Sequence, residues 1–163
     1  MIIKPISTPQ EIEGKALVHF QAWKEAYTGL ISQEYLDKRT LELSLSVAKR
    51  AFEGGIAGFA AKEDGRVIGF ADYGPCRDED LSSAGEVYAI YILKEYYGRG
   101  VGRALMTHAL DAMKEYKQIA VWVLENNRRA VRFYESFGYE PDGREKVLNL
   151  GAPVREIRMI LKR

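Results

Sequence analysis

The spacing of apolar residues changes along the chain from a helical period to an alternating one. The capping box Thr8-Pro9-Gln10-Glu11 predicts a helix start. An apolar stripe at helical spacing (Ile12, Ala16, Phe20, Trp23, Tyr27) extends this helix to Gly29. A short turn or helix is expected over Ser32–Leu36, and a further helix over Thr40–Phe52, ended by Gly54-Gly55. The first third of the chain is therefore predicted to be largely helical.

Alternating apolar and polar residues then indicate strands. Two of them, Ile56–Glu63 and Arg66–Tyr73, flank Asp64-Gly65, a strong hairpin signal. A polar loop over 74–85 contains Asp78, Glu79 and Asp80. The remaining predicted elements are strands over 1–6, 86–92, 119–124, 144–150 and 154–161, and helices over 100–116, with Val101, Leu105, His108, Ala112 and Met113 facing inward, and 127–137.

This order of elements predicts an α/β (α+β) fold with a central mixed sheet of about seven strands and about four flanking helices. At 163 residues, with 47% hydrophobic residues, one domain spanning 1–163 is expected. No internal repeat or low-complexity segment divides the chain.

Charge and cysteine content exclude several classes of function. A net charge of +1 argues against a nucleic-acid or membrane-surface binder. The single cysteine, Cys76, excludes an internal disulfide, and with only His19 and His108 as histidines we expect no metal site. No apolar run is long enough to span a membrane and no signal peptide is seen, so a soluble, cytoplasmic protein is expected.

The stretch between the strand 86–92 and the next helix has three alternating glycines, Gly98, Gly100 and Gly102. A glycine-rich turn opening into a helix is typical of a diphosphate site, because the first helical turn offers free N–H groups and positive charge. Arg103 and Ala104 follow Gly102, so this is no P-loop, which requires Gly-Lys-Ser/Thr. A dinucleotide-binding fingerprint fails too, since its third glycine is missing.

Two segments resemble the GNAT superfamily of acetyl-CoA-dependent N-acetyltransferases. Tyr97–Gly102 is similar to the family's pyrophosphate loop, Gln/Arg-x-x-Gly-x-Gly/Ala, with Tyr97 in place of Gln/Arg. The segment 123–139 resembles the second CoA-facing motif through Asn127, Ala130, Phe133, Tyr134, Glu135, Gly138 and Tyr139. The strand 86–92 is similar to the one that precedes the loop in many members.

The resemblance implies a GNAT-like fold and transfer of an acetyl group from acetyl-CoA to a primary amine, directly within a ternary complex. It implies Tyr134 as general acid and Glu86 as base, acting directly or through water. The residues implied to bind the cofactor are Ile90, Tyr91, Ile92, Tyr97, Gly98, Arg99, Gly100, Val101, Gly102, Arg103, Asn127, Ala130, Phe133 and Tyr134.

The acceptor side is expected around the end of the first helix, at Trp23, Tyr27, Leu30 and Ile31, whose aromatic rings would enclose an amine. The acceptor stays open: a polyamine, an amino acid, an aminoglycoside-like drug or a protein amino terminus all fit. A homodimer is an expectation from the family. The alternative function is a non-catalytic CoA-binding or regulatory module of the same fold.

Overall fold

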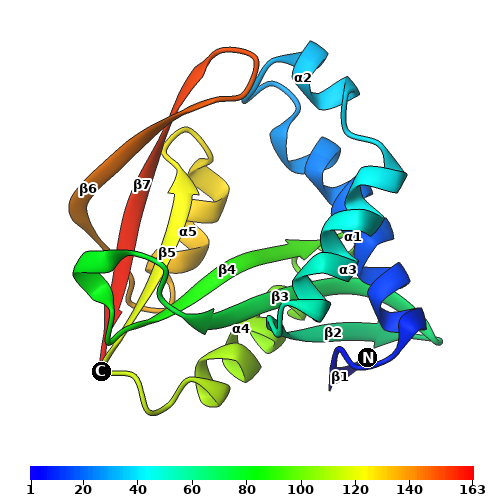
Figure 1. The fold of residues 1–163 in the computed structure, drawn as a ribbon, viewed down its shortest axis with the longest axis horizontal. Coiled ribbons are helices and arrows are strands. Elements are labelled where there is room, and N and C mark those ends of the chain that lie inside the picture. Colours follow the sequence, from blue (N-terminus) through cyan, green and yellow to red (C-terminus); the bar gives the residue numbers. More distant parts are fainter.

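The computed structural model describes residues 1–163, built on a seven-stranded sheet in the order β1-β2-β3-β4-β5-β7-β6 (Figure 1). Its strands are β1 (Ile2–Pro5), β2 (Ala57–Glu63), β3 (Arg66–Pro75), β4 (Gly85–Ile92), β5 (Gln118–Leu124), β6 (Glu140–Asn149) and β7 (Pro153–Lys162). The helices are α1 (Pro9–Tyr27), α2 (Gln33–Asp37), α3 (Leu41–Glu53), α4 (Val101–Ala112) and α5 (Arg128–Glu135), with 3₁₀ turns at Glu79–Leu81 and Lys94–Tyr96. The predicted mixed sheet is confirmed, with five α-helices where about four were expected.

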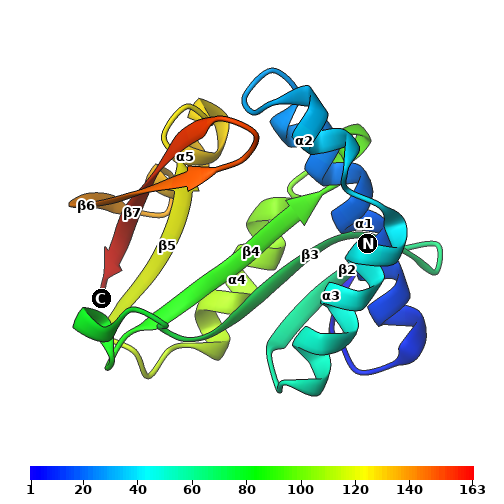
Figure 2. The same ribbon diagram turned by 45° about the horizontal axis from the view of Figure 1, so that its top comes forward.

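Adjacent residues of β3 point to opposite faces of the sheet and so contact different helices. Phe70 joins Val18 and Ala22 of α1 in one cluster, whereas Ala71 joins the α4 cluster on the other face. This alternation is the period-two pattern expected of a strand buried on both sides. The two faces are thus covered by different helices, α1 and α3 on one and α4 on the other (Figure 2).

The hydrogen-bonded pairing of β4 with β5 is short. These parallel strands pair only from Gly85 with Ile119 to Val87 with Val121, and then diverge (Figure 2). The register of β3 against β4 shifts beside Tyr88, because Asp72 pairs with Ala89 while Tyr73 pairs with Val87. Such a bulge bends and twists the strand that carries it. The sheet therefore opens between β4 and β5.

The predicted α4 helix needs two corrections. It ends at Ala112 rather than Tyr116, and Met113 and Tyr116 instead lie against Gly85, where a side chain on the glycine would collide with them. His108 and Ala112, predicted to face inward, are exposed. The buried face is formed by Val101, Leu105, Met106, Ala109 and Leu110.

Strand β6 begins at Glu140, four residues before the predicted start, and β3 extends to Pro75 into the predicted loop. No helix combines the length and apolar content that crossing a membrane would require.

Candidate functional site

A cavity of about 920 Å³ occupies the opening between β4 and β5. Tyr88–Ile92 of β4 and Trp122–Leu124 of β5 line its two sides. Because β4 loses its β5 partner after Val87, its backbone N–H and C=O groups on this edge are left for another partner. An extended ligand arm can pair with them as a strand would. Ile90, Tyr91 and Ile92, predicted to bind the cofactor, lie on this edge.

The glycine-rich turn closes one end of the cavity. Gly98 and Gly100 have φ of 76° and 81°, a left-handed conformation that glycine adopts without strain. Gly100 is the N-cap of α4 and no side chain caps the helix, so its first N–H groups face the cavity without a partner. This arrangement makes the turn an anion site. Its predicted residues Tyr97, Gly98, Gly100, Val101, Gly102 and Arg103 all line the cavity.

Four arginines add positive charge to the lining of the cavity. Arg103, Arg128, Arg129 and Arg132 line the cavity, and none of them forms an ion pair within the chain. The guanidinium of Arg129 lies 3.2 Å from the centre of the Tyr97 ring. Arg99, also predicted to contribute charge, does not line the cavity; its guanidinium lies 5.3 Å from the Tyr96 ring. Unpaired arginines at a helix N-terminus favour phosphate groups.

The second motif forms the adjacent wall. The side chain of Asn127 caps α5 by accepting a hydrogen bond from the Ala130 N–H at 3.2 Å. Asn127, Ala130, Phe133 and Tyr134 all line the cavity. A methyl group on Gly102 would come within 3.3 Å of both Phe133 and Ile92, so the absence of a side chain there lets α4 approach α5 and β4 closely.

Tyr134 lies on this wall with 6% of its surface exposed. Burial, with smaller contributions from Tyr27 and Tyr139, raises the pKa of its phenol well above the usual value of 10. The hydroxyl therefore stays protonated at physiological pH. No group of the chain accepts its hydrogen bond, so the proton is available to a ligand.

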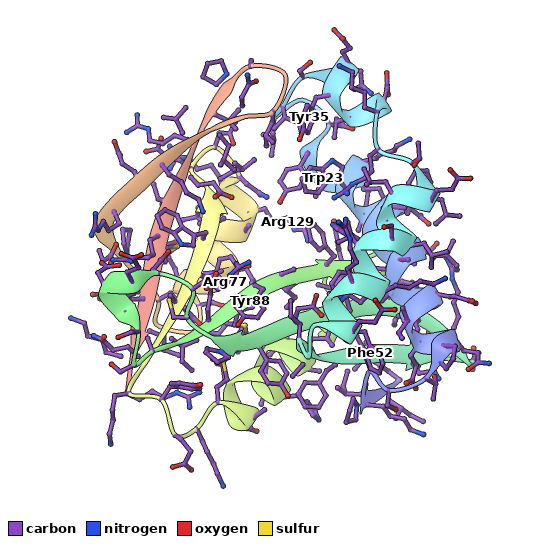
Figure 3. The ribbon with its side chains drawn as sticks, viewed as in Figure 1. Trp23, Tyr35, Phe52, Arg77, Tyr88 and Arg129 are labelled. Atoms are coloured by element: carbon purple, nitrogen blue, oxygen red, sulfur yellow. The ribbon has the colours of Figure 1, made fainter.

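An aromatic wall stands at the end of α1. The hydroxyls of Tyr27 and Tyr91 are 3.1 Å apart, and the rings of Tyr27 and Trp23 lie 4.7 Å apart, centre to centre. Figure 3 shows Trp23 across the opening from Arg129. Of the four residues expected on the acceptor side, Trp23, Tyr27 and Leu30 line the cavity and Ile31 does not. Its side chain packs instead against Leu36 and Leu124, beneath the wall.

The structure does not bring Glu86 into the cavity. Its side chain is 2% exposed and bound by Arg77, whose Nη2 lies 2.6 Å from Oε1. Figure 3 shows Arg77 beside Tyr88, and of these two residues only Tyr88 lines the cavity. A direct path from this carboxylate to an acceptor is therefore not open, and a role through water stays a prediction.

The two histidines, the cysteine and the acidic loop lie outside the cavity. His19 packs against Trp23, Phe70 and Tyr91. Burial raises the pKa of the Cys76 thiol, which keeps it from being a ready nucleophile. Asp78 and Asp80 of this loop bind the buried guanidinium of Arg158.

Sequence reasoning missed the wall that β6 and β7 contribute. Leu148, Leu150 and Glu156 line the cavity, and Leu150 packs with the α1–α2 segment. Gly151, at the turn between these strands, lies against Ser32 so closely that a side chain would collide. Nothing in the local sequence marks these residues, because only the sheet order places the hairpin beside α2.

Comparison with known proteins decides the family. The model of the acetyltransferase (GNAT) family matches residues 19–139, well over half of the chain. The chain belongs to this family. It is 30% identical over 151 residues to an uncharacterised N-acetyltransferase, YuaI, of Bacillus subtilis, covering 91% of this chain and 86% of that protein. A probable spermine N(1)-acetyltransferase of Bacillus subtilis subsp. natto is 34% identical over 49% of this chain and 57% of its own length.

The fold agrees with this membership. The structure of the PaiA N-acetyltransferase of Thermoplasma acidophilum, solved in complex with coenzyme A, superimposes over 100% of both chains with a TM-score of 0.76 at 21% identity. Family and fold together make this GNAT protein an acetyltransferase. Its free helix N–H groups, unpaired arginines and open β4 edge fit the diphosphate and the amide-bearing arm of acetyl-CoA.

Proposed function

We propose that this GNAT enzyme transfers an acetyl group from acetyl-CoA to a primary amine by direct attack within a ternary complex. The observation that carries the proposal is one continuous cavity, with an anion site at Gly98–Arg103 and an aromatic wall at Trp23 and Tyr27. Tyr134 lines the same cavity. Both substrates can therefore be bound at once, with a proton donor within the same space.

The chain's own groups would bind the cosubstrate along its length. The N–H groups at the start of α4 and the side chain of Arg103 would hold the diphosphate. The backbone of Ala89–Ile92 would pair with the amide groups of the pantetheine arm, since that edge of β4 has no strand partner there. Acetyl-CoA supplies the activated thioester; its reactive end would then lie near Tyr134.

The proposed chemistry forms a carbon–nitrogen bond and breaks the carbon–sulfur bond of the thioester. The departing thiolate needs a proton, and the phenol of Tyr134 remains protonated to donate it. The attacking amine loses its proton to water in the cavity, which passes it to the solvent. An acyl-enzyme is not required, since Cys76 does not line the cavity.

The test of this proposal measures both acetyl-CoA binding and turnover. Isothermal titration with acetyl-CoA, together with release of free thiol over a panel of amines, is expected to show binding and acceptor-dependent release. Binding without release across a broad panel would favour the non-catalytic module instead. The similarity to a probable spermine N(1)-acetyltransferase supports including polyamines in the panel.

Three further expectations from the sequence remain proposals: a single domain over residues 1–163, a cytoplasmic location and a homodimer. Gel filtration with light scattering tests the last of these.

A further inference from the structure

Glu156 is a carboxylate within the cavity that the proposed chemistry does not use. It lies on β7, opposite Leu124 of β5 and Lys146 of β6. Its side chain is 17% exposed, and its Oε2 is 3.3 Å from Lys146 Nζ. The side chain of Lys146 is 45% exposed, and its ammonium also lies 4.2 Å from the centre of the Trp122 ring, so the ion pair is open to solvent and a second ammonium group can replace it.

Four arginines and two carboxylates line the cavity. The arginines belong to α4 and α5. Of the two lining carboxylates, Glu25 is already engaged by the Lys94 backbone N–H at 2.8 Å. Glu156 is the one that no N–H of the backbone binds. The cavity thus offers one exchangeable carboxylate, on strand β7.

This carboxylate faces the acceptor side. Glu156 is paired across the sheet with Leu124, whose cluster packs against Trp23, Tyr27 and Leu30 of the aromatic wall. Leu148 and Leu150 provide apolar surface beside it.

A largely apolar and aromatic cavity whose lining includes both a proton donor, Tyr134, and an exchangeable carboxylate, Glu156, suits an alkyl chain with two ammonium groups. We propose that Glu156 pairs with the second, non-reacting ammonium group of the acceptor, so that the enzyme prefers diamines and polyamines to monoamines. Lys146 occupies this carboxylate in the free protein, and the acceptor displaces it. The inference rests on the proposed transfer to amines and names the class of acceptor.

The experiment compares putrescine with butylamine, which has the same carbon chain but a single amine. Wild type is expected to have the higher kcat/KM with putrescine. In Glu156→Gln, kcat/KM for putrescine should fall about tenfold to a hundredfold, chiefly through KM, because a charge-assisted hydrogen bond is lost. The value for butylamine should stay unchanged. Lys146→Met should lower the KM for putrescine, since the competing cation is gone.

Glu145→Gln is the matched control, because this carboxylate lies on β6 but binds Arg155 and does not line the cavity. In this variant the ratio of kcat/KM for putrescine to kcat/KM for butylamine should equal that of wild type. If wild type uses butylamine as well as putrescine, the proposal is wrong although the proposed transfer stands. If kcat of Glu156→Gln falls equally with both amines, Glu156 acts in proton transfer and the proposal is also wrong. If neither amine causes thiol release while another amine of the panel does, only the diamine proposal is wrong; if no amine of the panel causes release, the proposed transfer is wrong as well.

Discussion

Arg77 encloses the carboxylate of Glu86 with three hydrogen bonds. Its backbone N–H and Nε donate to Oε2 at 3.0 and 3.2 Å, and Nη2 donates to Oε1 at 2.6 Å. The same guanidinium lies 4.3 Å from the centre of the Tyr88 ring. The pair therefore fastens the segment after β3 to β4 beside the bulge that opens the sheet.

Glu86→Gln should lower stability more than turnover. Loss of charge-assisted hydrogen bonds to a buried group is expected to reduce the free energy of unfolding by about 1–3 kcal/mol, measured by urea denaturation. Steady-state thiol release should change much less than the hundredfold or more typical of a lost general base. Arg77→Gln serves as the companion variant and should also be destabilised, because Glu86 keeps only the backbone donor. A fall in kcat of a hundredfold with unchanged stability would establish Glu86 as the base.

Tyr134→Phe should reduce turnover about hundredfold or more while leaving acetyl-CoA affinity nearly unchanged, because only the donated proton is removed. Thiol release and calorimetry measure the two quantities. Tyr139→Phe is the control: Tyr139 is a neighbouring buried tyrosine whose hydroxyl has no partner and does not line the cavity. Its turnover should match wild type. Wild-type turnover in Tyr134→Phe would remove this residue from the mechanism.

Gly100→Ala should weaken acetyl-CoA binding about tenfold, because a side chain at φ of 81° strains the anion turn by about 1–2 kcal/mol. Calorimetry measures the dissociation constant. Gly55→Ala introduces the same strain at φ of 79° after α3, outside the cavity. It should cost stability without changing the dissociation constant. Equal affinities in Gly100→Ala and wild type would argue against a diphosphate at this turn.

Arg99, in the glycine-rich turn, and Arg103, in the first turn of α4, should differ in their effect on cofactor binding. Arg103→Gln is expected to raise the dissociation constant of acetyl-CoA about fivefold. The positive charge that it removes from the cavity should contribute roughly 1 kcal/mol to the binding free energy. Arg99→Gln should change it less, because Arg99 does not line the cavity. The difference between the dissociation constants of the two variants should be smaller in titrations at high salt than at low salt, because salt screens the charge. The reverse ranking would show that Arg99 turns toward the bound cofactor.

His19 should make stability depend on pH. Burial, with the positive charges of Arg39 and Lys15, lowers the pKa of its imidazole to about 3, against 6.5 when unfolded. Between these values the unfolded chain binds the extra proton, so the free energy of unfolding falls as pH decreases through that window, by at most about 1.4 kcal/mol per pH unit.

Urea denaturation at pH 7 and 5.5 measures this effect. Between pH 7 and 5.5, the free energy of unfolding of His19→Gln, which retains an acceptor for Arg39, should fall by about 1 kcal/mol less than that of wild type. His108→Gln, at an exposed position, should behave as wild type. Parallel pH dependence in wild type and His19→Gln would contradict the prediction.

The sequence predicted those parts of the site that depend on neighbouring residues. The glycine-rich turn and the cap Asn127 could be recognised because glycines at positive φ and helix caps are local features. Tyr134, proposed through a motif within one helix, also lines the cavity. Glu86, Arg99 and Ile31 do not line it, which the sequence could not show, since the direction of a side chain depends on what packs around it.

By itself, the sequence determined the type and order of nearly every element, because capping, turn chemistry and apolar period act within a few residues. Only the tertiary structure decided which residues line the cavity. Strand β4 diverges from β5, and β7 lies between β5 and β6 in the sheet. This arrangement brings Glu156 and Leu150 to the end of α1. These contacts join residues more than a hundred positions apart, and their energy comes from packing whole elements together, which no local pattern encodes.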